Sequence, residues 1–315
     1  AFGAGLAMTV FCKTKNHVIY AKEGFVIVAF AWILMSAIGA LPFVISGEIP
    51  SFIDAFFETV SGFTTTGASI LTDVEAMSHG MLFWRSFTHW IGGMGVLVFI
   101  LTILPLAGGY NMYLMRAEST GANVSKFVPR VKESARILYK IYLAITVIVV
   151  TCLLIAGMPL FDSLLLAFGT VGTGGFGILN DSAASYSVAV QAILTIFMIA
   201  CGINFNVYYL LLDKKPKEAL KCEEMRWYLL IIAASTAIIT FQVRGDFSSI
   251  FEAIHHVLFQ VASIISSTGF GTVDFDKWPA LSQSVLVLIM FIGACAGSTG
   301  GGMKVSRIVV LCKTI

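Results

Sequence analysis

The segment "SFIDAFFETVSGFTTTGASI", residues 51–70, begins as an apolar run headed by an acidic residue and ends in hydroxyl residues and a glycine. A helix needs about 20 predominantly apolar residues to cross a bilayer, and this run is shorter. The pattern therefore predicts a short helix that dips into a membrane and returns as an extended polar segment. Such backbone is tolerated at membrane depth only inside protein or beside a water-filled cavity.

The same pattern recurs twice along the chain, as "LFDSLLLAFGTVGTGGFGIL" at 160–179 and "SSIFEAIHHVLFQVASIISSTGFGTVDF" at 248–275. Each copy has a carboxylate near its start and a glycine after its hydroxyl residues. The pairs are Asp54 with Gly67, Asp162 with Gly175, and Glu252 with Gly269. The first two spacings are equal, and the third is longer by about one helical turn. Three equivalent re-entrant segments are expected to converge on one axis.

Composition places the chain in a membrane, because 57% of its residues are hydrophobic, 12% are charged and its mean hydropathy is +0.89. Soluble proteins are far more polar. We predict six spans, at roughly 23–45, 80–105, 137–157, 186–212, 227–243 and 282–315, the last one interrupted. They form three units at 23–110, 137–212 and 227–315, separated by cytoplasmic loops at 111–136 and 213–226. Residues 1–22 are expected to end a preceding helix and to lead into the first span.

The placement of charge predicts an orientation. All Lys and Arg residues except Arg85, Arg244 and Lys277 lie before the first span, around the two long loops or after the break in the last span. The positive-inside rule puts those segments in the cytoplasm. The short loops of the opposite face carry Asp73, Glu75, Asp181, Asp274 and Asp276. An acidic vestibule on that outer face would concentrate cations.

The glycine and hydroxyl segments suit a cation filter. Selectivity filters replace a cation's hydration shell with backbone carbonyl oxygens, and glycine allows the dihedral angles that aim successive carbonyls inward. Oxygen ligands suit hard cations, and the negative C-terminal ends of the short helices would point toward the ion path. One such motif alone is more often a turn or a helix-packing patch. Three copies in register favour the filter.

The last predicted span contains "GACAGSTGGG", residues 293–302. Each glycine costs about 1 kcal/mol relative to alanine in a helix interior, so this run is expected to be non-helical. The alternative is close helix packing through small residues.

Two interpretations stay open for each of three basic residues. Lys304 and Arg307 either snorkel to the inner membrane edge or contact the pore, and Arg85 either pairs with a pore-helix acid such as Glu58 or reaches the headgroups.

Taken together, the motifs resemble those of the Trk/Ktr/HKT superfamily of potassium transporters, and most of all its TrkH-type potassium uptake subunits. The resemblance covers essentially the whole chain. It rests on "SGFTTTGAS" at 61–69, "FWRSFTHWIGGMG" at 83–95, "TVGTGGFG" at 170–177, "SSTGFGTVDF" at 266–275 and "GACAGSTGGGMKV" at 293–305. The segments "YAKEGF" at 20–25 and "VPRVKESARILYKIY" at 128–142 favour the Trk branch.

The resemblance implies an all-α integral membrane fold of repeated span–pore helix–span units around a pseudo-fourfold pore, with three of the four units present. It implies a potassium filter made of Thr64, Thr65, Thr66, Gly67, Gly172, Thr173, Gly174, Gly175, Ser266, Ser267, Thr268 and Gly269. The ion itself would lie at Thr66, Gly67, Gly174, Gly175, Thr268 and Gly269. It also implies a gate loop that obstructs the pore, at Gly293, Ala294, Cys295, Ala296, Gly297, Ser298, Thr299, Gly300, Gly301 and Gly302. In plant relatives a serine in place of the first filter glycine accompanies sodium selectivity, so the glycines here point to potassium.

The resemblance further implies a multi-pass protein of the bacterial inner membrane that takes up potassium, forms a homodimer, contacts lipid and binds a cytoplasmic nucleotide-binding subunit of TrkA type. Potassium is the transported ligand, and neither a cofactor nor a nucleic-acid partner is expected. The fourth filter of the family pattern is missing from the sequence. We interpret the sequence as part of a longer polypeptide, since an open ring would expose polar filter backbone to lipid.

Two other classes of protein compete with this interpretation. A broken-helix secondary transporter, such as a cation-coupled symporter, would bind substrate at the midplane and tends to show inverted repeats, whereas these repeats are parallel. A membrane-embedded enzyme would need facing acid–base or metal groups, and the sequence shows no phosphate loop or nucleophile–base pattern. His89, His255 and His256 lack the spacing of metal ligands and are expected to pack or hydrogen-bond locally.

Overall fold

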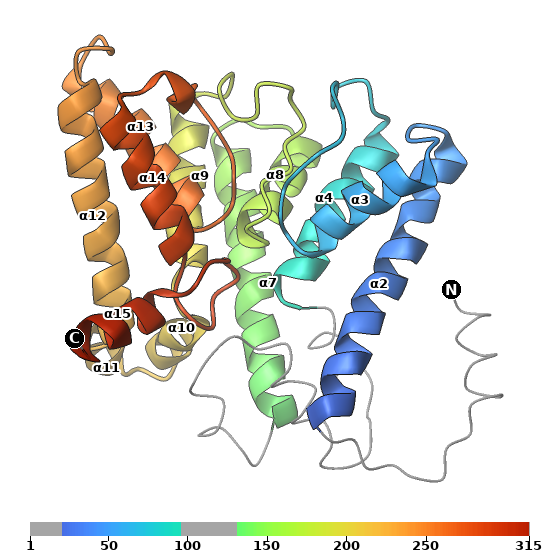
Figure 1. The fold of residues 1–315 in the computed structure, drawn as a ribbon, viewed down its shortest axis with the longest axis horizontal. Coiled ribbons are helices and arrows are strands. Elements are labelled where there is room, and N and C mark those ends of the chain that lie inside the picture. Colours follow the sequence, from blue (N-terminus) through green and yellow to red (C-terminus); the bar gives the residue numbers. More distant parts are fainter. Residues whose placement is uncertain (1–20, 96–130, 315) are drawn as a thin grey trace.

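A computed structural model describes residues 21–95 and 131–314, and within these ranges the chain is helical with no strand (Figure 1). Three triplets of helices follow one another along the described sequence. The first is α2 (Ala21–Ser46), α3 (Phe52–Phe63) and α4 (His79–Gly93), the second is α7 (Val131–Ile155), α8 (Leu160–Val171) and α9 (Val188–Cys201), and the third is α12 (Glu223–Val243), α13 (Ile250–Ile265) and α14 (Ala280–Ile292). The other elements are α10 (Phe205–Leu212) and α11 (Pro216–Leu220) between the second and third triplets, the 3-10 helix η2 (Phe275–Lys277) before α14, and α15 (Val305–Thr314) after it. This arrangement confirms the predicted all-helical fold class.

The triplets follow one another across the molecule. In Figure 1 they run from right (blue) to left (red), with the short helices α3, α8 and α13 in the upper half and α10, α11 and α15 gathered at the lower left. Each triplet thus contains one long helix, one short helix and a third helix that leads back down. Parallel repeats of this kind agree with the repeated sequence pattern.

Within residues 21–95 and 131–314, three helices are long and apolar enough to cross a membrane: Phe25–Ser46, Ile137–Ile155 and Glu223–Val243. The predicted span at 186–212 is not one straight helix, because α9 and α10 are bent by 91° at the break between them. Gly202 ends α9, and the Asn204 side chain caps α10 by accepting a hydrogen bond from Asn206 N at 2.9 Å. The sequence indicated an interruption only in the last span, so this break was not predicted.

The N-terminal ends of the three short helices carry residues that stabilise the start of a helix. The hydroxyls of Ser51 and Ser249 accept hydrogen bonds from Asp54 N and Glu252 N, and an acidic residue stands in the first turn of all three helices. Side-chain oxygens satisfy free N–H groups there, and negative charge is favoured at a helix N-terminus. The helices have 12, 12 and 16 residues, which corresponds to about 18 to 24 Å. They are too short to cross a hydrocarbon core of about 30 Å.

Neighbouring triplets share their hydrophobic cores. Leu165 of α8 packs in one cluster with Ala40 and Phe43 of α2. Phe259 of α13 packs in another with Leu166 of α8 and Leu194 of α9. The short helices α8 and α13 therefore each pack against the preceding triplet, which fixes the order of the triplets around one another.

The run after α14 is non-helical from Gly293 to Lys304, as predicted. Gly293 has a φ of +71°, a conformation that other residues rarely adopt, and it ends α14. Residues 1–20, residues 96–105 of the predicted second span and most of the predicted basic loop at 111–136 lie outside the described residues.

Candidate functional site

The three segments that follow the short helices share their backbone conformation at three equivalent positions. We call residues 64–67, 172–175 and 266–269 the first, second and third filter segments. Each begins with a right-handed C-cap, continues with a left-handed residue and ends at a left-handed glycine. The left-handed residues are Thr65 (φ +54°), Thr173 (+54°) and Ser267 (+59°), and the glycines are Gly67 (+77°), Gly175 (+74°) and Gly269 (+90°).

The hydrogen bonds of these turns also repeat. In the first segment, Thr65 N donates to Gly62 O at 3.1 Å and Thr66 N donates to Ser61 O at 2.9 Å. The equivalent bonds are Thr173 N to Thr170 O and Gly174 N to Gly169 O, and Ser267 N to Ile264 O and Thr268 N to Ser263 O. This is the Schellman helix ending, in which the left-handed position is usually glycine. A left-handed threonine or serine costs about 1–2 kcal/mol, and such strain collects at functional sites.

The filter segments converge. A Cβ atom built on Gly67 would overlap the carbonyl oxygen of Gly174 and would lie 3.8 Å from that of Thr268. A Cβ on Gly175 would in turn overlap the Thr268 oxygen. Two carbonyl oxygens from different triplets therefore lie around the first filter glycine, and the absence of a side chain there lets the backbones approach so closely.

The second segment is enclosed, and the other two have an open side. Gly172, Thr173 and Gly174 are buried, whereas Thr64, Thr66 and Gly269 are exposed. No atom within the described part of the chain comes within 4 Å of a Cβ built on Gly269. Among the described residues, the three segments thus form a partial ring in sequence order that is open between the third segment and the first.

Side chains support the filter backbone from behind. The hydroxyls of Thr64 and Thr66 lie 2.8 Å apart, and those of Ser266 and Thr268 lie 2.7 Å apart. The second segment has glycines at both positions, and a Cβ on Gly174 would collide with the ring of His89 from α4. His89 is fully buried and accepts a hydrogen bond from Phe176 N at 3.3 Å. Its local packing agrees with the prediction.

Arg85 pairs with Glu58, which resolves the alternatives left open by the sequence. The Nε atom of Arg85 lies 2.6 Å from Glu58 Oε1, and both side chains are almost completely buried. The second alternative, contact with lipid headgroups, is excluded by this burial.

The predicted gate loop lies directly against the third filter segment. Gly301 N donates to Ser267 Oγ at 2.6 Å, and a Cβ on Gly300 would come within 2.8 Å of Ser266 O. A larger residue than glycine would not fit at that position. The loop is therefore in direct contact with the third filter segment.

The loop is also hydrogen-bonded to the backbone at the break between α9 and α10. Cys295 N donates to Gly202 O at 3.0 Å, and Phe205 N donates to Gly297 O at 2.9 Å. Sequence reasoning did not single out this second break. The pair of a glycine and a helix-capping asparagine at 202 and 204 was the available signal.

Two charged side chains hold the loop. Glu224, in the first turn of α12, accepts hydrogen bonds from Ala296 N at 2.7 Å and Ser306 N at 3.1 Å with a single oxygen. Lys304 is 5% exposed, and its ammonium group donates to the carbonyl oxygens of Gly300 and Gly301. Of the two alternatives left open for Lys304, snorkelling is excluded, because its buried ammonium group is hydrogen-bonded to carbonyl oxygens of the loop. Arg307 is exposed, as snorkelling requires.

The remaining histidines bond locally, as predicted. His255 Nε2 lies 2.8 Å from Gln191 Oε1, and His256 Nδ1 lies 3.0 Å from Thr272 Oγ1. Across the described residues, no three His, Cys, Asp or Glu side chains are grouped so that they could hold a metal ion. The candidate site consists instead of backbone and hydroxyl oxygens.

The loops beyond the filter segments carry the acidic residues singled out in the sequence. Asp73, Glu75, Asp181, Asp274 and Asp276 are all exposed. A hydrogen bond from Asn180 lowers the pKa of Asp73, and one from Lys277 lowers the pKa of Asp274. Both carboxylates are therefore ionised at neutral pH and give the approach to the filter a negative charge.

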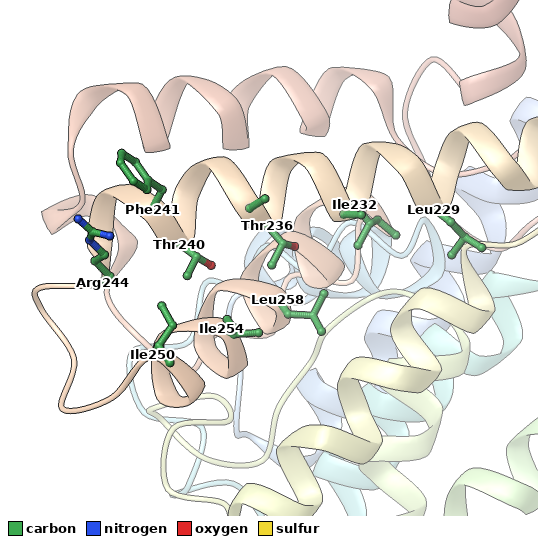
Figure 2. Close-up of a pocket in the computed structure, with 11 residues that line it drawn as sticks. Leu229, Ile232, Thr236, Thr240, Phe241, Arg244, Ile250, Ile254 and Leu258 are labelled. Atoms are coloured by element: carbon green, nitrogen blue, oxygen red, sulfur yellow. The ribbon is translucent and has the colours of Figure 1, made fainter.

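An apolar groove of about 520 Å³ lies elsewhere, between α12 and α13 (Figure 2). Ile232 and Thr236 line it from α12, Ile254 and Leu258 line it from α13, and Arg244 lies near one end. None of the filter segments lines this groove. It has no oxygen cage for a cation and is separate from the candidate site.

The amino-acid sequence is similar to those of known membrane transport proteins. The profile of the TrkH family, described as a cation transport protein, matches residues 1–315. The chain belongs to the TrkH family. It is 37% identical over 311 residues to the Trk system potassium uptake protein TrkH of Salmonella typhimurium, covering 96% of this chain and 64% of that protein. It is 34% identical over 306 residues to the Trk system potassium uptake protein TrkG of Escherichia coli, covering 96% and 63%.

A solved structure has the same fold. The crystal structure of the potassium transporter TrkH from Vibrio parahaemolyticus superposes with a TM-score of 0.84 at 32% identity, over 99% of this chain and 64% of that one. The likeness confirms the resemblance drawn from the motifs. This TrkH family chain spans a little under two thirds of the length of the relatives it matches.

Proposed function

We propose that this chain forms three walls of a potassium uptake pathway in a bacterial inner membrane. The observation that carries the proposal is the convergence of the Gly174 and Thr268 carbonyl oxygens beside Gly67. Family membership supports transport of a cation, and the names of the relatives support potassium.

In this mechanism a hydrated cation collects at the acidic loops and loses water to the carbonyl oxygens of the filter segments. The ion would lie among Thr66, Gly67, Gly174, Gly175, Thr268 and Gly269. No covalent chemistry is involved, so the protein acts as a transporter and not as an enzyme. Potassium is its ligand, and no cofactor takes part.

A fourth wall is supplied by a part of the polypeptide outside this sequence. Two observations support it: the open side of Gly269 and the greater length of the relatives. Carbonyl oxygens that face lipid would cost several kcal/mol each, so a closed ring is strongly favoured.

Residues 293–302 act as the gate. The loop contacts the third filter segment through Gly301 and the broken second inner helix through Cys295. It therefore lies where it would obstruct an ion leaving the filter. A regulatory subunit of TrkA type would bind the cytoplasmic face, where Lys214, Lys215, Lys217 and Lys221 are exposed, and two copies of the transporter would form a homodimer.

The test is rubidium uptake by liposomes that contain the complete natural polypeptide, with empty liposomes as the control. Uptake that is competed by external potassium and not by equal sodium is the expected result. Uptake equal to that of empty liposomes, or equal competition by both ions, would contradict the proposal.

A further inference from the structure

A buried ion pair lies behind the first two filter segments. Arg85 of α4 is 3% exposed and Glu58 of α3 is 1% exposed, with 2.6 Å between Nε and Oε1. Taking two charges out of water is costly, and their attraction offsets that cost only when further hydrogen bonds satisfy both groups. Those further bonds show what the pair holds in place.

The Glu58 carboxylate binds the chain as it leaves the first filter segment. Ser69 Oγ donates to Oε1 at 3.0 Å and lies 3.2 Å from Oε2, and Ile70 N donates to Oε2 at 3.0 Å. Ser69 and Ile70 follow Gly67 closely in the sequence. Glu58 therefore fixes the backbone at Ser69 and Ile70, immediately after the first filter segment. We call the few residues that follow each filter segment its return.

The Arg85 guanidinium binds the chain as it leaves the second filter segment. Its Nη1 donates to Gly177 O at 3.0 Å, and its central carbon lies 3.6 Å from the centroid of the Phe176 ring. His89, one turn further along α4, stacks on the same ring at 3.9 Å. Arg85 therefore connects the return of the second segment to that of the first through Glu58.

The other triplets lack this pair at the equivalent positions. Counted back from the helix C-caps, Glu58 corresponds to Leu166 in α8 and Gln260 in α13. Counted from the N-caps, Arg85 corresponds to Leu194 in α9 and Leu286 in α14. All four are buried. Three of them are leucines, so the fold accepts apolar packing at these positions, whereas Gln260 donates from Nε2 to Val273 O at 3.3 Å. The charged pair differs in that it bonds to the chain after two different filter segments.

We propose that Glu58 and Arg85 are positioning residues that determine ion specificity. The pair sets the separation of the first and second filter segments, and with it the size of the oxygen cage that distinguishes potassium from the smaller sodium ion. This inference rests on the proposed function, in which these segments line an ion filter. It assigns the selectivity to a contact that lies outside the ion path.

The test compares the potassium-to-sodium permeability ratio of the complete protein in liposomes with that of a double variant, Glu58→Leu with Arg85→Leu. This variant reproduces the leucine pair of the second triplet, so no unpaired charge is left buried. We expect the ratio to fall about tenfold, equivalent to about 1.4 kcal/mol. The matched control is Glu223→Leu with Lys313→Leu, which removes an exposed ion pair of 2.7 Å far along the chain from the filter and should leave the ratio unchanged.

Two single variants keep the test decisive if the double variant does not assemble. Ser69→Ala leaves the ion pair intact and removes one of the hydrogen bonds to Glu58 at an exposed residue, so it should lower the ratio by a smaller factor. Arg85→Lys keeps the charge but not the planar fork of donors, and should give a ratio between those of the wild type and the double variant. Folded variants with the wild-type ratio would overturn the inference. A wild-type protein with no preference for potassium would instead contradict the proposed function, and the positioning role with it.

Discussion

The three filter segments repeat one another bond for bond, whereas the helices that follow them continue in different ways. The left-handed residues, the helix endings and the key glycines coincide in all three segments. After the short third helices, α9 bends by 91° into α10, and α14 gives way to a glycine-rich loop. Equivalent filter segments thus lead to unequal elements further along each triplet.

The difference has a physical reason. The charge of a potassium ion is spherically symmetric, so oxygen ligands in equivalent positions around the ion hold it best. This requirement favours identical turns in the filter segments. An obstruction below the filter needs only one segment that crosses the path. The sequence of each triplet is therefore free to diverge once the chain has left the filter.

The largest expected effect comes from breaking the equivalence of the filter segments. In Gly175→Ala, the new Cβ would overlap Thr268 O, and the left-handed backbone alone costs alanine about 1–2 kcal/mol. We expect potassium flux in liposomes to fall by at least about tenfold. The matched control is Gly177→Ala, whose Cβ would meet its nearest neighbour at 3.6 Å. Equal flux in both variants would show that the close approach at Gly175 does not matter.

Gly269→Ala tests whether the ring is closed by a fourth wall. The described chain leaves open space at this position, although the φ of +90° is as unusual as at the other two glycines. In the complete protein we expect a loss of flux close to that of Gly175→Ala, because a fourth carbonyl would occupy the equivalent place. A clearly milder loss would mean that the third segment borders an open side.

A smaller effect is expected on the inner side, at Glu224. Hydrogen bonds to a charged group contribute about 1.5–3 kcal/mol each. Glu224 accepts one from Ala296 of the gate loop and one from Ser306, near the start of the helix α15 that follows the loop. Glu224→Ala should loosen the loop and raise potassium flux several-fold with an unchanged potassium-to-sodium ratio. Its neighbour Glu223, which pairs with Lys313 on the surface, provides the control Glu223→Ala. Lower flux together with a lower Tm would indicate general destabilisation instead.

Much of the fold was predictable because it depends on local patterns. The short helices follow from a capping residue, an early carboxylate and an apolar run of limited length, as in Phe52–Phe63. The left-handed glycines could be placed because few residues other than glycine take that conformation. The break after Cys201 was missed because the apolar pattern continues across it, and a single glycine in a helical run is weak evidence of an interruption.

The contacts made by charged residues were harder to foresee. Lys304 near the end of a span usually reaches the membrane surface, and only the three-dimensional course of the loop shows that its ammonium meets carbonyl oxygens. Glu224 gave no signal at all, since an acid in the first turn of a helix is commonly explained by the helix dipole. Bonds between segments so distant in sequence depend on tertiary packing.

The most direct test of the central claim is the potassium-to-sodium flux ratio of the complete protein carrying Gly67→Ser, measured in liposomes beside the wild type. Gly67 is the residue around which the carbonyl oxygens of Gly174 and Thr268 gather. The filter assignment predicts that serine displaces those oxygens and that the preference for potassium falls about tenfold or more. A folded Gly67→Ser protein that transports potassium and sodium in the wild-type ratio would contradict it.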